Sequence, residues 1–232
     1  MRPEPPSQQP NRSIFVTVGT TLFDPLIEAA TSETFIRSMA RREFGLYTDI
    51  IVQYGKGRVR PFGECVGNGG SSSNKPDGDD HGDNSEIDES LLLSFPKPTG
   101  NGTDDTIVDV VTEVMCRCRA YRFRPSLTEE MRSADLILSH AGAGSIMEGL
   151  SLGKKVAVVI NSRLMHNHQD ELAGALEERG YLYVVREPSL LFDDSTLKEI
   201  EQFVPIAFPS GEDKGFADLL DHQMGFEPTS HS

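Results

Sequence analysis

The 232-residue sequence has little cysteine, no long apolar run and no apolar segment at its start. Its three cysteines are an odd number without framework spacing, which argues against a secreted, disulfide-stabilised protein. No stretch approaches the ~18 apolar residues that a membrane-spanning helix needs. The first residues also lack the apolar region of a secretory signal. We therefore expect a cytoplasmic protein that does not itself span a membrane.

Basic residues are scarce as well. Lys and Arg number 22 against 36 Asp and Glu, which gives a net charge of −14. Because sequence-independent binding of nucleic acid depends on clustered Lys and Arg that meet phosphates, we expect no nucleic-acid partner.

Much of the negative charge lies between residues 64 and 105, which hold ten acidic and two basic residues. The stretch 68–86 is rich in Gly, Ser, Asn and Asp, and such a composition buries too little apolar surface to fold. Residues 77–88 approach the spacing of an EF-hand calcium loop, but Asp88 replaces the bidentate Glu and no helices flank the loop. We therefore predict a disordered acidic insertion over 64–105, although the apolar run 90–95 is able to pack locally.

Elsewhere, apolar runs alternate with helical patterns. We predict strands at 14–18, 49–54, 136–139, 156–160 and 181–185, and one or two strands, or a helix, within 107–123. We predict helices from Asp24 to about Glu43, after Pro125, and at 145–152, 168–179 and 195–203. The alternation indicates an α/β fold with a Rossmann-like parallel sheet, helices on both faces and ligands at the carboxyl ends of the strands. The folded domain covers 13–208, between a disordered tail at 1–12 and a weakly structured tail at 209–232.

A glycine loop followed by a helix start is the most informative local pattern. Gly142 and Gly144 allow a backbone to approach a ligand closely, and the free amides of a helix that starts at Ser145 hold anions. His140, at the end of the preceding strand, can donate to a phosphate oxygen. Glu148 lies three residues past Ser145 and can accept from both hydroxyls of a ribose. The competing interpretation is a tight turn followed by a capping box between Ser145 and Glu148.

Two other loops carry polar candidates. The first, Gly19-Thr20-Thr21, is not a GxGxxG loop, and the second strand does not end in an acid, so the sequence argues against NAD binding. His166 and His168 have no third ligand close in sequence, so we predict no metal site and no cofactor. Hydrogen bonds from His168 and Gln169 to sugar hydroxyls are the functional interpretation of that loop, and helix capping is the alternative.

The segment HAGAGSIME at 140–148 fits the pattern H-x-G-x-x-S/T-x-x-E of the nucleotide-sugar half of GT-B glycosyltransferases. Together with FVTVGTTLFDPLI at 15–27 and the long block 135–182, it resembles the small cytosolic catalytic subunits of the eukaryotic dolichol-pathway UDP-N-acetylglucosamine transferases, in glycosyltransferase family 28. The resemblance implies the donor-binding C-terminal domain of a GT-B fold. It also implies contacts to the diphosphate from Gly19, Thr20 and Thr21, to phosphate from His140, Gly142, Gly144 and Ser145, to ribose from Glu148, and to the GlcNAc ring from His168 and Gln169.

An activity follows from the same resemblance. It is the inverting transfer of GlcNAc from UDP-GlcNAc to the lipid-linked acceptor dolichol-diphosphate-GlcNAc, for protein N-glycosylation. The chain would work as a heterodimer with a membrane-anchored subunit that supplies the acceptor-side domain and recruits it to the cytosolic face of the endoplasmic reticulum. No general base is assigned, and the partner is one place for it. The alternatives are a non-catalytic nucleotide-sugar-binding subunit, a stand-alone transferase with a soluble acceptor, and a metal-dependent hydrolase that uses His166 and His168.

Overall fold

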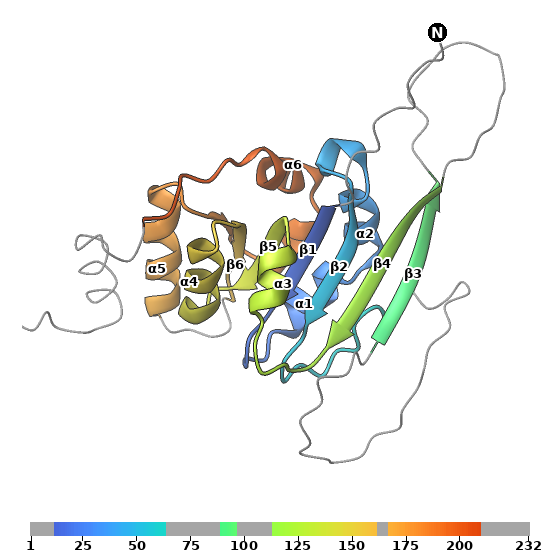
Figure 1. The fold of residues 1–232 in the computed structure, drawn as a ribbon, viewed down its shortest axis with the longest axis horizontal. Coiled ribbons are helices and arrows are strands. Elements are labelled where there is room, and N and C mark those ends of the chain that lie inside the picture. The colour runs from blue at the N-terminus through green and yellow to red at the C-terminus, as the bar shows by residue number, and fades with distance from the viewer. Residues whose placement is uncertain (1–11, 64–88, 97–112, 162–166, 210–232) are drawn as a thin grey trace, which may run out of the picture.

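The computed structural model describes residues 12–63, 89–96, 113–161 and 167–209, which form one sheet with helices on both faces (Figure 1). The seven strands of this part of the chain lie in the order β3-β4-β2-β1-β5-β6-β7. Their bounds are Arg12–Thr17 (β1), Tyr47–Gln53 (β2), Glu89–Pro96 (β3), Glu113–Tyr121 (β4), Leu136–His140 (β5), Lys155–Val159 (β6) and Tyr183–Val185 (β7). Every neighbouring pair is parallel except β3 and β4. The predicted Rossmann-like α/β fold is confirmed.

Alternation along the strands builds two cores. On β1, Ile14 and Val16 face one layer of helices and Phe15 faces the other, as the two-residue period of a strand requires. Figure 1 shows α3 and α4 on the near side of the sheet and α1 and α2 behind it. The helices are α1 (Asp24–Ala30), α2 (Glu33–Met39), α3 (Thr128–Ser133), α4 (Ala143–Ser151), α5 (Asn167–Glu178) and α6 (Asp194–Gln202), with short 3₁₀ turns η1 (Arg42–Phe44) and η3 (Pro188–Phe192).

The helix predicted from Asp24 to about Glu43 is divided into α1, α2 and η1. The division occurs because Ser32 caps α2, its hydroxyl accepting a hydrogen bond from the backbone N–H of Phe35 at 3.2 Å. Asp24 is the first residue of α1 and not its N-cap. Its carboxylate accepts instead from the backbone N–H groups of Arg58, at 2.9 Å, and Val59, at 3.4 Å.

Strand β3 lies inside the range 64–105 that the sequence predicts as a disordered insertion, so the prediction is wrong for residues 89–96. Leu91 and Leu93 are half-buried against the main core, and β3 pairs with β4 along its whole length. Local apolar packing therefore outweighs the acidic composition of the surrounding sequence. The remainder of the predicted insertion, the tail 1–11 and residues 210–232 lie outside the described residues.

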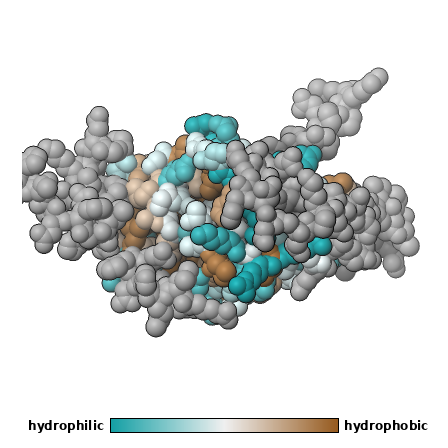
Figure 2. Space-filling model, turned by 90° about the horizontal axis from the view of Figure 1, so that it is seen from below, coloured by the Kyte–Doolittle hydropathy of each residue, from teal (hydrophilic) through white to brown (hydrophobic). Residues whose placement is uncertain are grey.

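The strand order reverses its direction between β1 and β5. Chain connections move outward from β1 through β2 to β4 on one side, and from β5 through β6 to β7 on the other. Ligands of doubly wound sheets bind at the carboxyl ends of the strands where this reversal occurs. The arrowheads of β2 and β4 mark this edge at the bottom of Figure 1, and Figure 2 looks onto it from below. No helix in the described part of the chain is long and apolar enough to cross a bilayer.

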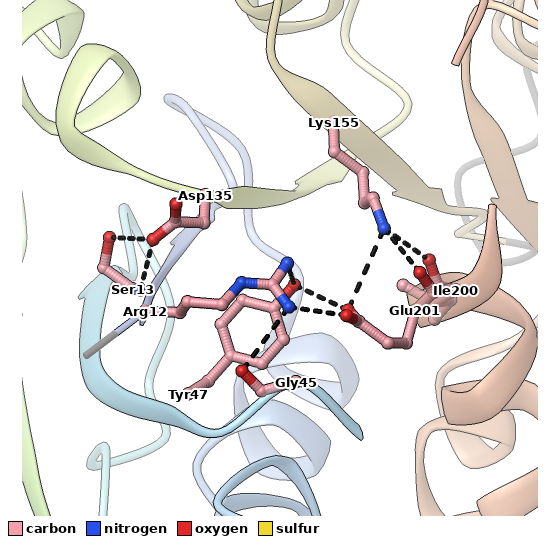
Figure 3. A network of polar contacts seen from close by, with 8 residues as sticks. All are labelled: Arg12, Ser13, Gly45, Tyr47, Asp135, Lys155, Ile200 and Glu201. Carbon is pink, nitrogen blue, oxygen red and sulfur yellow. Dashed lines mark hydrogen bonds and ion pairs between the residues drawn. The ribbon is translucent and has the colours of Figure 1, made fainter. Parts of the chain in front are cut away.

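At the opposite edge, a polar network fastens α6 to the sheet (Figure 3). Arg12 donates to a carboxylate oxygen of Glu201 at 2.5 Å and to the hydroxyl of Tyr47 at 2.5 Å, and Tyr47 donates to the other oxygen of Glu201 at 2.9 Å. Lys155 donates to the backbone carbonyl of Glu201 at 2.7 Å. Burial raises the pKa of Tyr47 well above its usual value, so this hydroxyl stays protonated and keeps donating.

Candidate functional site

The loops that follow β1 and β5 meet around the imidazole of His140. Gly19 has a φ of +57°, and a Cβ added there would lie 2.9 Å from Cε1 of His140. A Cβ added at Gly142 would lie only 2.2 Å from Nε2 of the same ring. Both positions therefore accept only glycine while the ring stays in place. The structure brings together these three residues, which the sequence predicts as parts of one site.

The loop after β1 is held by Gln53, which sequence reasoning did not single out. Its side-chain amide donates to the carbonyl of Gly19 at 2.7 Å, and its oxygen accepts from the hydroxyl of Thr17 at 2.7 Å. The backbone N–H and the hydroxyl of Thr21 both donate to the carbonyl of Val18, whereas Thr20 is exposed. An uncharged polar side chain at the end of a buried strand was the available signal for Gln53, since such a group needs partners.

His140 is only 9% exposed, and burial lowers its pKa below the ordinary value. The backbone of Thr17 is near enough to oppose this shift, but Nδ1 is buried and makes no hydrogen bond of acceptable geometry. The ring is therefore neutral at physiological pH. A neutral imidazole donates one hydrogen bond without carrying a full charge.

Helix α4 begins at Ala143 with Gly142 as its N-cap, two residues earlier than the sequence predicts. Ser145 therefore lies within the first turn, so the alternative of a capping box with Ser145 as its N-cap is wrong. The first amides of a helix have no acceptor within the helix, which leaves donors at Ala143, Gly144 and Ser145. Gly144 is exposed, and a Cβ added there would meet nothing within 4 Å. The turn is open to an approaching ligand.

Glu148 lies one turn further along α4 and is half-buried. One of its carboxylate oxygens accepts from the hydroxyl of Thr128 at 2.5 Å. Thr128 is the first residue of α3, and both its hydroxyl and its backbone N–H are bonded to the hydroxyl of Ser126, at 2.9 and 3.2 Å. This contact fixes the direction of Glu148 from outside its own helix, and no spacing rule in the sequence pointed to Thr128.

His168 and Gln169 lie in the first turn of α5, which follows β6 at the same edge of the sheet. The predicted helix is confirmed, with its start at Asn167, while His166 lies outside the described residues. Within the described ranges, no group of three or more His, Cys, Asp or Glu is arranged to hold a metal ion. Two cavities, of about 280 and 510 Å³, lie elsewhere, over β2 and β4, and share the lining residues Ile51, Arg119 and Ser133.

This chain is similar to known proteins in both its sequence and its fold. Residues 93–205 match the glycosyltransferase family 28 C-terminal domain. The UDP-N-acetylglucosamine transferase subunit ALG13 of Homo sapiens is 34% identical over 172 residues, which cover 74% of this chain and 11% of the relative. The subunit of the same name from Saccharomyces cerevisiae is 29% identical, with 74% of this chain and 76% of the relative covered.

The fold similarity extends over nearly the whole chain. An NMR solution structure of ALG13 superposes with a TM-score of 0.58 at 23% identity and covers 90% of this chain and 95% of that one. The chain spans only about a tenth of the length of the human and mouse relatives that it matches.

Proposed function

Because residues 93–205 of this chain belong to the C-terminal domains of glycosyltransferase family 28, we propose that it is the donor-binding, catalytic subunit of a UDP-N-acetylglucosamine transferase. The acceptor is a lipid-linked GlcNAc, dolichol-diphosphate-GlcNAc, and the product carries the second GlcNAc of the oligosaccharide used for N-glycosylation. A membrane-anchored partner supplies the acceptor-side domain and brings the chain to the cytosolic face of the endoplasmic reticulum. Relatives that are themselves named as transferase subunits support this assignment.

The single observation that carries the proposal is the open first turn of α4 beside a neutral, buried imidazole. The free amides of this turn and the positive end of the helix dipole suit a diphosphate. His140 adds a hydrogen-bond donor from the end of β5, and the loop 19–21 closes the same space from the end of β1. Glu148 is one helical turn away, where it accepts from the ribose hydroxyls.

Chemistry at this site is an inverting displacement. A hydroxyl of the acceptor sugar attacks the anomeric carbon of GlcNAc, the bond from that carbon to the diphosphate breaks, and UDP leaves. Negative charge grows on the leaving diphosphate, so donors fixed at the start of α4 stabilise the transition state more than the ground state. His168 and Gln169, in the first turn of α5, contact the GlcNAc ring. A general base must take the hydroxyl proton, and no residue of this chain is assigned to that role.

The test replaces Gly144 by alanine in the complex of the full chain with its partner. The added methyl has free space in the protein and blocks only the approach of a ligand. We expect the KM for UDP-GlcNAc to rise about tenfold or more, as expected when a charge-assisted contact worth about 1.5–3 kcal/mol is lost. Gly174→Ala, in α5, is the matched control, because a Cβ there also meets nothing within 4 Å.

Equal KM values for Gly144→Ala and Gly174→Ala would show that the diphosphate does not bind at this turn. Glu148→Ala tests the site itself. If Glu148 holds the ribose, transfer falls because UDP-GlcNAc binds more weakly, whereas undiminished transfer in this variant would count against the proposed site. Full turnover by the isolated chain on a soluble acceptor would favour a stand-alone transferase.

A further inference from the structure

The loops that follow β2 and β4 form a basic surface on an acidic protein. These loops, residues 54–63 and 122–124, are called the basic edge here. Together they contain five basic residues and no acidic one, in a chain whose net charge is −14. The basic residues are Lys56, Arg58, Arg60, Arg122 and Arg124. Figure 2, which looks onto this side of the molecule, shows strongly hydrophilic residues interspersed with apolar ones.

The backbone of the basic edge is firmly held. Tyr54 and Gly55 donate their N–H groups to the carbonyls of Tyr121 and Arg122, at 3.1 and 3.2 Å, so the two loops are hydrogen-bonded to each other. The guanidinium of Arg122 donates back to the carbonyls of Gly55 and Gly57, at 3.4 and 3.2 Å. Side chains on such a turn start from a fixed backbone, which reduces the entropy lost when they bind a ligand.

The five cations are not equivalent. Arg122 holds the turn, and Arg124 pairs with Glu130 and lies 4.2 Å over the ring of Tyr121. Lys56 and Arg58, in contrast, are exposed and form no ion pair with any residue in the described part of the chain. The nearest carboxylate on the neighbouring helix, that of Asp24, already accepts from the backbone N–H of Arg58 at 2.9 Å.

The basic edge is directly joined to the donor site. A Cβ added at Gly55 would lie 2.8 Å from the carbonyl oxygens of both Gly19 and Thr21, so this turn packs on the loop after β1. Exposed apolar side chains accompany the cations: Leu22, which follows Thr21, is 45% exposed, and Phe123, between Arg122 and Arg124, is 40% exposed. Cations and apolar groups side by side fit a ligand that combines an anion with a hydrocarbon chain.

We propose that the basic edge binds the diphosphate of the lipid-linked acceptor, with Lys56 and Arg58 as its cationic ligands. The inference rests on the proposed function and adds an acceptor contact on the donor-binding subunit. A second diphosphate beside that of UDP-GlcNAc is repelled by it, so this place requires full positive charges in addition to helix amides. Phe123 and Leu22 contact the first units of the lipid chain.

The experiment measures both KM values for the full chain in complex with its membrane-anchored partner. The variant is Lys56→Ala with Arg58→Ala. The matched control is Lys154→Ala with Lys198→Ala, which also removes two cations, at the opposite edge of the sheet, where the parallel strands begin. The acceptor is GlcNAc joined through a diphosphate to a short prenyl chain, used free in solution and, as a long-chain form, in neutral vesicles. We expect the KM for the acceptor to rise about tenfold in both settings, with the KM for UDP-GlcNAc unchanged.

Other results would overturn the proposal. A rise confined to vesicles would assign the cations to lipid headgroups, and a rise in the KM for UDP-GlcNAc would assign them to the donor. An unchanged KM for the acceptor, or an equal change in the control, would show that the basic edge does not bind the acceptor diphosphate.

A binding measurement separates failure of this inference from failure of the proposed function. The short-chain acceptor, titrated into the full chain without its partner, is followed by NMR at the amides of Gly55, Gly57 and Phe123. Shifts there that vanish in the Lys56→Ala, Arg58→Ala variant support the contact even if no transfer is observed. Absence of shifts in the unaltered chain contradicts it.

Discussion

At the scale of the residue, His140 shows how burial selects one protonation state. The ring is enclosed by two glycine loops and lies at the end of β5, so its charged form is poorly solvated and its pKa is lowered. In the function that we propose, a bound diphosphate supplies the negative charge that these loops lack. The neutral ring then donates a hydrogen bond to it.

This protonation state predicts a pH-dependent stability. The unfolded chain binds a proton on His140 near pH 6.5, whereas the folded chain does so only at lower pH. Stability from the neutral ring is therefore complete above about pH 6.5 and is lost as the pH falls through the lowered pKa, by up to about 1.4 kcal/mol per pH unit. Urea unfolding at pH 7.5 and 5.5 should show a larger loss for the unaltered chain than for His140→Asn. Equal losses in the two proteins would contradict this.

At the scale of the element, α4 and α6 are fixed by different means. The sequence placed the start of α4 at Ser145 because serine is a preferred N-cap. The structure starts it at Ala143, with Gly142 as the N-cap, where any side chain would collide with His140. That contact depends on the position of the His140 ring in the folded protein, so the spacing of residues along the sequence does not reveal it. Helix α6 was predicted within one residue at each end, and the structure shows that Asp193 caps it with hydrogen bonds from the N–H groups of Ser195 and Thr196.

The anchoring of α6 makes a stability prediction. Glu201→Ala removes the carboxylate that accepts from both Arg12 and Tyr47, so the hydroxyl proton of Tyr47 loses its acceptor and Arg12 keeps only Tyr47 and the carbonyl of Gly45. We expect a loss of about 1–3 kcal/mol in the free energy of unfolding, below that of a fully buried pair because both side chains remain about a quarter exposed.

The control for this change is Glu33→Ala. It breaks the exposed pair with Arg37 on α2 and should cost under about 0.5 kcal/mol. Chemical denaturation measures both variants, and equal losses would show that the network does not anchor the helix.

At the scale of the whole molecule, the sequence predicted the class of fold, while the site at the carboxyl edge of the sheet stays a prediction. Strong β-branched runs and regular alternation with helices identified the strands of the sheet other than β3, including β4 within a broader range. Strand β3 was missed because its apolar residues lie in acidic, low-complexity sequence and pair only with β4. The contacts of Gln53 and Thr128 were missed because each joins elements that are distant along the chain.

The proposed site at the edge of the sheet also predicts a property of the whole fold. UDP at a hundred times its dissociation constant should stabilise the chain by about 2.7 kcal/mol, which raises Tm by about 5–10 °C for a protein of this size. The shift should be unchanged by a chelator, since we predict no metal. Differential scanning fluorimetry with UDP, with and without EDTA, checks this, and a shift that disappears with EDTA would refute the metal-free site.

Cys116 and Cys118 occupy alternate positions of β4 and lie in the main core as free thiols. Burial raises the pKa of Cys116 to about 12, so neither solvent nor an alkylating reagent meets a thiolate there in the native protein. In a Cys65→Ser background, the labelling rate of these two sulfurs would report how often the sheet comes apart around β4. Alkylation followed by mass spectrometry would thus measure the opening of the sheet with no probe engineered into it.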